Sequence, residues 1–284
     1  MTLFLDFRIQ DVGGPVSGPR LCEGDGTAAP LSLPTIPPAR VAGRLAGRDL
    51  LFVAHGFNNS RPQGAYALGT LDGYLNLPPP GLMIGVLWPG DCWLPLVDYP
   101  FEGDVAEASG KRLAGFCNDL AGQVRSFSFA SHSLGARLVL EALGWLTPQA
   151  RTLCLTAGAI NRDCLTAQYA ASGRNAGAVS ALASRKDWVL KVAFSLGDPL
   201  ADLLEGDHTP FQAALGRFGP RAPVPGNVAA PWQIPDAEGY DHGNYLPPTA
   251  PPRPGAPPPG PPWQRPADFI RRAFLGQPQT WPPL

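Results

Sequence analysis

Short apolar runs separated by helical patterns constrain the fold of this chain more than any other feature. Between Arg40 and about Tyr245, runs suited to buried strands recur at Leu50–Ala54, Gly81–Trp88, Val124–Ala130, Thr152–Ala157 and Ala178–Ala183. Helical patterns follow the first three runs, over Gln63–Leu75, Phe101–Leu120 and Leu134–Leu146. This alternation predicts an α/β fold with a mostly parallel central sheet and helices on both of its faces. Binding and catalytic residues are then expected at the carboxyl ends of the strands.

Composition divides the chain into three parts. We expect an N-terminal strand and a Gly/Pro-rich connection in residues 1–39, the α/β domain in 40–246 and a Pro-rich tail in 247–284. Residues 247–262 hold ten prolines in sixteen positions, which favours an extended polyproline conformation. A short amphipathic helix is expected after it, at Ala267–Leu275. The tail is interpreted as a strap across the surface, and a partner that binds PxxP segments is the alternative.

Charge and cysteine content exclude several classes of partner. The chain has 22 basic and 23 acidic residues, which offers no basic surface for nucleic acid or an anionic membrane. No apolar run approaches the ~20 residues that span a bilayer, and the N-terminus alternates like a strand rather than a signal peptide. The five cysteines show no zinc-like spacing. We therefore expect a cytoplasmic protein without a metal or an organic cofactor.

The segment Ser131-His132-Ser133-Leu134-Gly135 carries the strongest chemical signal, because it lies between a predicted strand and an amphipathic helix. A nucleophile elbow requires small residues two positions before and two after the serine, since the strand-to-helix turn is sharp. Gly135 meets this requirement, and Ser131 replaces the usual glycine. Ser133 would then lie where the amino end of a helix stabilises negative charge.

A second segment, His55-Gly56-Phe57-Asn58-Asn59, follows the first buried run directly. Beside a nucleophile elbow, a turn of this kind supplies one backbone N–H of an oxyanion hole, and the residue after the serine supplies the other. These donors would be the N–H groups of Phe57 and Leu134. The alternative is that His55 and Asn58 only cap a tight turn.

A serine nucleophile needs a base and an acid. His55 and His132 belong to the two motifs, and the side chain of His132 is expected to point away from Ser133. Of the two remaining histidines we favour His242, because His208 follows the fifth run too closely to leave room for another helix and strand.

The acid should lie just past the fifth run, where it would orient the imidazole. Asp187 lies at that place, Asp198 is the competitor if Lys191–Leu196 is the strand, and Asp163, which follows the fourth run, is a third choice. Their spacing alone leaves the choice open.

Several of these segments occur in an order that is more specific than any one of them. They are residues 53–60 (VAHGFNNS), 88–90 (WPG), 106–113, 132–135 (HSLG), 157–163, 184–188 (SRKDW) and 242–245 (HGNY). Together they resemble bacterial esterase/lipase-like α/β-hydrolases over roughly residues 48–246. The resemblance implies a Ser133–His242–Asp187 triad and favours Asp187 as the acid. Ser131 and the long Pro-rich ends depart from the family pattern.

The predicted activity is hydrolysis of a small-molecule carboxylic ester through an acyl-enzyme. Few residues separate the fourth and fifth runs, so no large lid is expected between them. We expect Trp93, Tyr99 and Phe101, in the loop after the second run, to form an apolar wall that binds substrate. The alternatives are a thioesterase or peptidase that uses the same triad, and a non-catalytic binding module on the same fold.

Overall fold

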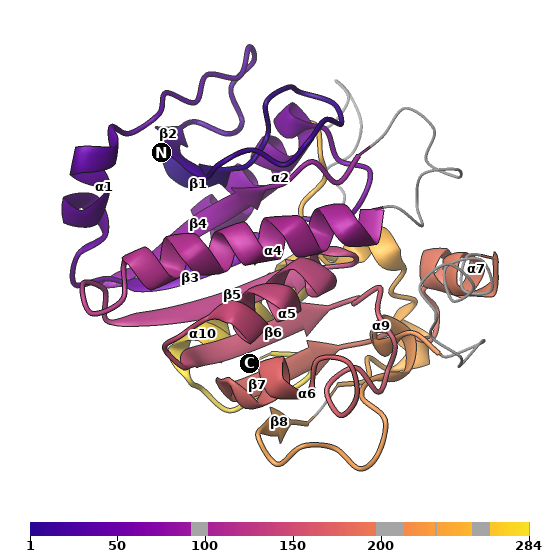
Figure 1. Cartoon of the computed structure of the whole chain (residues 1–284). Helices are drawn as coiled ribbons and strands as arrows, with labels where there is room; N and C mark the ends of the chain where they lie inside the picture. Colours follow the sequence, from indigo (N-terminus) through magenta and orange to yellow (C-terminus); the bar gives the residue numbers. More distant parts are fainter. Residues whose placement is uncertain (92–101, 197–212, 231, 252–261, 284) are drawn as a thin grey trace.

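The apolar runs form neighbouring strands of one eight-stranded sheet in the computed structural model (Figure 1). The structure describes residues 1–91, 102–196, 213–230, 232–251 and 262–283. The strand order is β2-β1-β4-β3-β5-β6-β7-β8, and only the β1–β2 pair is antiparallel. The strands are β1 (Thr2–Asp6), β2 (Arg20–Gly24), β3 (Asp49–Ala54), β4 (Gly81–Leu87), β5 (Ser126–His132), β6 (Ala150–Thr156), β7 (Ala176–Leu182) and β8 (Val228–Ala229). The predicted fold class, with a mostly parallel sheet, is confirmed.

Helices cover both faces of the sheet (Figure 1). They are α1 (Pro38–Leu45), α2 (Arg61–Leu75), α4 (Glu102–Asp119), α5 (Gly135–Trp145), α6 (Ala170–Arg174), α7 (Trp188–Leu196), α9 (Leu215–Phe218) and α10 (Gln264–Leu275), with short 3-10 turns at η2 (Asp236–Glu238) and η3 (His242–Asn244). Residues 157–175 connect β6 to β7, so no large lid is inserted there.

Alternation along β3 shows how the sheet divides the core into two. Leu50 and Phe52 pack with α4 and α5 on one face, whereas Leu51 and Val53 pack with α2 and α10 on the other. Successive side chains of a strand point to opposite faces, so a strand covered on both sides must be apolar throughout. All six residues of β3 are buried.

The N-terminal region contains a strand that was not predicted. Residues 11–39 were expected to be a connection, but Arg20–Gly24 forms β2 and pairs with β1 at the sheet edge. This segment is short and lies between Gly- and Pro-rich stretches, so its own sequence carries little strand signal. Its partner strand decides its conformation.

The predicted C-terminal helix is present and packs on the sheet. It begins three residues earlier than expected, at Gln264, and buries Phe269, Ile270 and Phe274 in the core shared with α2. Residues 252–261 of the Pro-rich segment lie outside the described residues, so the strap and the PxxP-binding partner both remain predictions. Within the described part of the chain, no helix is long and apolar enough to cross a membrane.

Candidate active site

Ser133 lies in a sharp turn between β5 and α5. Its backbone φ is +54°, a left-handed conformation that costs a non-glycine residue about 1–3 kcal/mol. Hydrogen bonds hold this conformation from both sides: the Ser133 N–H donates to the Thr156 carbonyl at 3.1 Å, and the Ser133 carbonyl accepts from Ala159 at 3.1 Å. The turn therefore presents the Ser133 side chain at the carboxyl edge of the sheet.

Two glycines allow the turn after β3 to lie directly against this elbow. A Cβ atom added at Gly135 would lie 2.6 Å from the His55 carbonyl oxygen. One added at Gly56 would lie 2.9 Å from the Ser133 Cβ and 2.8 Å from the His132 Nδ1. Real Cβ atoms do not approach so closely, so a side chain at either position would push the two segments apart.

Ser131, where the elbow pattern has glycine, is accommodated. Its side chain is buried at 1 % exposure, and its hydroxyl finds no hydrogen-bond partner among the described residues. Ser131 is therefore a second buried serine, two residues before Ser133, and within the described ranges its hydroxyl makes no hydrogen bond to a histidine.

The side chains of Ser133, His242 and Asp187 form a hydrogen-bonded line. The His242 Nε2 lies 2.8 Å from the Ser133 Oγ, and the His242 Nδ1 lies 2.8 Å from the Asp187 Oδ2. An ionised carboxylate only accepts hydrogen bonds, so Nδ1 carries the proton and Nε2 accepts from the Ser133 hydroxyl. Asp187 is fully buried, whereas the His242 side chain remains 14 % exposed.

Asp187 takes its position from the start of α7. Its Oδ1 accepts from the Leu190 N–H at 2.9 Å, as in a helix cap, which leaves Oδ2 for His242. The alternative acid Asp163 instead faces Arg221 at 3.8 Å. Asp198 and the alternative base His208 lie outside the described residues.

Asp241 connects the segment that carries the acid with the segment that carries the histidine. Its Oδ1 accepts from the backbone N–H of Trp188 at 2.9 Å and from that of His242 at 2.8 Å. The Asn244 side chain in turn accepts from the Asp241 N–H at 2.7 Å. Sequence reasoning missed Asp241, although an Asp directly before a 3-10 turn is a recognisable capping signal.

The side chain of His132, which was expected to point away from Ser133, lies against His242. Its ring lies 4.7 Å from the His242 ring, centroid to centroid, and its Nε2 donates to the His242 carbonyl at 2.9 Å. The two residues are 110 positions apart, so no local pattern could have revealed the contact. His132 thus buttresses the backbone that carries the His242 side chain.

The turn after β3 is held at several points. The Asn59 side-chain amide donates to the carbonyls of Gly56 and Phe57 at 3.0 and 3.1 Å, and the Asn58 N–H donates to Gly90 at 2.6 Å. The Trp88 indole donates to the His55 carbonyl at 2.9 Å, and the two rings stack. Phe57 therefore sits in a well-defined turn against the elbow, and Leu134 follows Ser133 at the start of α5.

Acid is expected to destabilise the folded state through His55 and His132. Burial is the main reason that the pKa of each falls from an ordinary 6.5 to about 3. Electrostatic repulsion lowers the pKa further, from Arg8 in the case of His55 and from His242 in the case of His132. Between pH 6.5 and about 3 the two histidines are protonated in the unfolded chain but neutral in the folded one. Their contribution to the free energy of unfolding is therefore complete above pH 6.5 and is lost as pH falls toward 3. The free energy of unfolding should fall by about 1.4 kcal/mol per pH unit for each histidine between roughly pH 6 and 4.

Denaturant titrations from pH 7 to pH 4 measure this slope. His132→Gln keeps a side-chain N–H donor but cannot be protonated, so its slope should be shallower than that of the wild type. Equal slopes in the two proteins would contradict the lowered pKa of His132.

The proposed substrate wall cannot be placed here, because Trp93, Tyr99 and Phe101 lie outside the described residues. No group of three or more His, Cys, Asp or Glu side chains in the described ranges could hold a metal ion.

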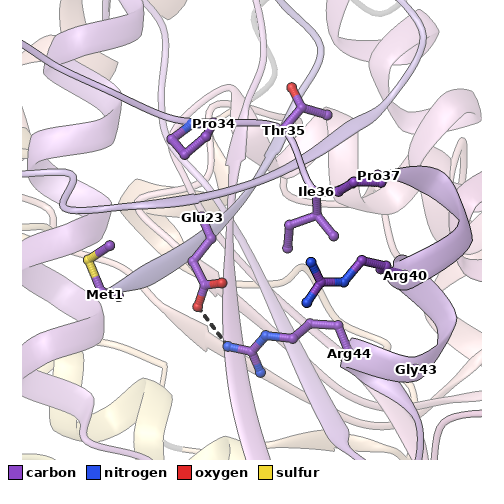
Figure 2. Close-up of a pocket in the computed structure, with 9 residues that line it drawn as sticks. All are labelled: Met1, Glu23, Pro34, Thr35, Ile36, Pro37, Arg40, Gly43 and Arg44. Carbon is purple, nitrogen blue, oxygen red and sulfur yellow. Dashed lines mark hydrogen bonds and ion pairs between the residues drawn. The ribbon is translucent and has the colours of Figure 1, made fainter.

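A separate surface pocket lies away from this site, between α1 and the edge strands (Figure 2). It has a volume of about 660 Å³, and the side chains of Arg40 and Arg44 extend into it. Arg44 is paired with Glu23 at 2.7 Å. Glu23 pairs with Leu3 near the amino end of β1. The pocket therefore lies at the amino ends of the parallel strands, whereas Ser133 lies at their carboxyl ends.

Comparison with known proteins agrees with this architecture. Residues 41–211 match the model of a family described as "Alpha/beta hydrolase of unknown function (DUF900)". Searches of curated proteins and of solved structures found no match.

Proposed function

Since the chain belongs to this α/β-hydrolase family of unknown function, we propose that it is a serine hydrolase that cleaves carboxylic esters. The observation that carries the proposal is the hydrogen-bonded line from Ser133 through His242 to Asp187. Nucleophile, acid and base follow one another along the chain in the order typical of the fold. The strained backbone at Ser133 supports the same assignment, because strain of this kind concentrates at functional sites.

The reaction begins with attack of the Ser133 Oγ on the ester carbonyl carbon. His242 Nε2 takes the hydroxyl proton, and the buried Asp187 stabilises the imidazolium that forms. The carbonyl oxygen becomes an oxyanion, which accepts hydrogen bonds from the backbone N–H groups of Phe57 and Leu134. Each such donor contributes about 3 kcal/mol to stabilising the transition state.

Collapse of the tetrahedral intermediate breaks the bond to the leaving alcohol, which takes the proton from His242. Water then attacks the acyl-enzyme with His242 again as base, and the acid product leaves Ser133 free. Asp241 and His132 contribute by holding the backbone of His242, because both contact its main-chain atoms.

Labelling with a fluorophosphonate probe tests the proposal. The wild type should form a covalent adduct that mass spectrometry places on the peptide holding Ser133, and Ser133→Ala should not label. Ser131→Ala is the matched control: it removes a hydroxyl from the same buried segment and should label at the wild-type rate.

Turnover of a panel of p-nitrophenyl esters, thioesters and p-nitroanilides then separates an esterase from a thioesterase or a peptidase on the same residues. A folded wild-type protein that neither labels nor turns over any member of the panel would favour the non-catalytic binding module instead.

A further inference from the structure

Arg8 is a fully buried charged residue at the carboxyl ends of the strands, the same end of the sheet as the candidate active site. β1 runs parallel to β4. Arg8 follows the carboxyl end of β1, and the segment from Trp88 to Asp91 follows the carboxyl end of β4. The Arg8 side chain is 0 % exposed. A buried guanidinium is costly unless ion pairs and hydrogen bonds compensate for its lost hydration, so its contacts are informative.

The guanidinium of Arg8 bridges three separate segments. Its Nη1 donates to the Asp91 carboxylate at 2.6 Å and to the Asp11 carbonyl at 3.2 Å, while its Nη2 donates to the Asn59 carbonyl at 2.5 Å. Asp91 is itself 4 % exposed. The Arg8 fork thus joins the turn after β3 to the segment after β4.

The bond to Asn59 leads directly to the candidate oxyanion turn. The Asn59 side chain donates to the carbonyls of Gly56 and Phe57, and Asn58 donates to Gly90 in the segment that ends with Asp91. The turn is therefore held from within by Asn59 and from outside by Arg8. Asn58 has a left-handed φ of +60°, a conformation that asparagine adopts more readily than most residues and that suits a tight turn.

We propose that Arg8 is a positioning residue for the oxyanion hole. By holding the Asn59 carbonyl and the Asp91 carboxylate together, it fixes the turn that directs the Phe57 N–H at the substrate carbonyl oxygen. The inference rests on the proposed hydrolase function and extends it to a residue outside the family match at 41–211. Hydrogen-bond donors of this kind act only when their geometry is set in advance, because small displacements lose much of their effect.

Arg8→Lys is the principal test. Lysine keeps the positive charge opposite Asp91, but a single ammonium cannot replace the planar fork that reaches Asp91 and Asn59 together. The kcat for a p-nitrophenyl ester should fall about tenfold, less than the loss of a whole oxyanion donor. The KM should change less than about twofold, because the turn acts on the transition state.

A thionoester, with sulfur in place of the carbonyl oxygen, provides a readout that a loss of stability would not move. Sulfur is larger and a weaker hydrogen-bond acceptor than oxygen, so a thionoester gains less from a correctly placed N–H. The ratio of kcat/KM for the oxoester to that for the thionoester should therefore fall in Arg8→Lys. An unfolded fraction would lower both values by the same factor.

Asp49→Asn is the matched control. Asp49 is a buried carboxylate at the amino end of β3, the strand whose carboxyl end bears the turn, and it accepts from the Ser126 hydroxyl at 2.6 Å. Its variant should keep the wild-type oxoester-to-thionoester ratio. Arg8→Met with Asp91→Leu removes the whole buried pair without leaving an unpaired charge, and it should show the same reduced ratio as Arg8→Lys.

The positioning role would be overturned if Arg8→Lys kept the wild-type kcat and the wild-type oxoester-to-thionoester ratio. It would also be overturned if Arg8→Lys and Asp49→Asn each lost equal activity on the two substrates. Either result would leave the hydrolase proposal intact. The hydrolase proposal itself fails at an earlier step, if the wild type does not label at Ser133.

Discussion

Alanine in place of Ser133 is expected to lower the kcat for ester hydrolysis by about 10⁴-fold or more, because no other atom can form the acyl-enzyme. The fold should survive, since the backbone hydrogen bonds that hold the elbow involve main-chain atoms only. Steady-state kinetics on protein with a wild-type circular dichroism spectrum measures the effect. A folded variant that retains a few per cent of the wild-type kcat would place the nucleophile elsewhere.

Loss of His242 should not add to this effect. His242→Ala is expected to cost about as much as Ser133→Ala, and the double variant no more than either, because the two side chains act in one proton transfer. Additive losses would indicate that they act in separate steps.

Asp187→Asn is expected to lower kcat by about 10⁴-fold while preserving the shape of the site. The amide oxygen can still accept from the Leu190 N–H, but its NH₂ group would donate to His242 Nδ1 and so favour the tautomer with the proton on Nε2. Such an imidazole cannot accept the Ser133 proton.

Asp163→Asn, at the alternative acid that faces Arg221, is the control and should retain wild-type kcat. Pre-steady-state measurement of p-nitrophenol release would show whether acylation is the slowed step. Near-normal turnover in Asp187→Asn would shift the assignment to another acid.

The elements whose determinants are local were predicted closely. The strand expected at Leu50–Ala54 is β3 at Asp49–Ala54, and the helix expected at Gln63–Leu75 is α2 at Arg61–Leu75. Both carry their signal in their own residues: a continuous apolar run in β3, and Pro62 with a Ser60–Gln63 capping box at the start of α2. The third strand was displaced by two residues, because its run of alternating small and aromatic residues marks no clear end.

The residues of the candidate site divide in the same way. The elbow at Ser133 and the turn at Phe57 could be located because each combines small residues with a strand end in one short segment. The acid could not be selected by spacing alone; only in the folded chain does Asp187 rather than Asp163 face His242. The His132 ring, the Asp241 carboxylate and the Arg8 guanidinium act through partners distant in sequence, and no local pattern marked them.

By itself, then, the sequence determined the α/β architecture, the order along the chain of the central strands and of the helices α2, α4 and α5, and the position of its sharpest turn. These depend on periodicity, capping and the size of neighbouring residues, which act over a few positions. Only the tertiary structure decided that Arg20–Gly24 would become an edge strand, which carboxylate would meet the imidazole, and that a buried arginine just after the first strand would reach the Asn59 carbonyl in the turn at Phe57. Such contacts depend on the register in which distant segments pack, and register is a property of the whole sheet and of the loops at its carboxyl edge.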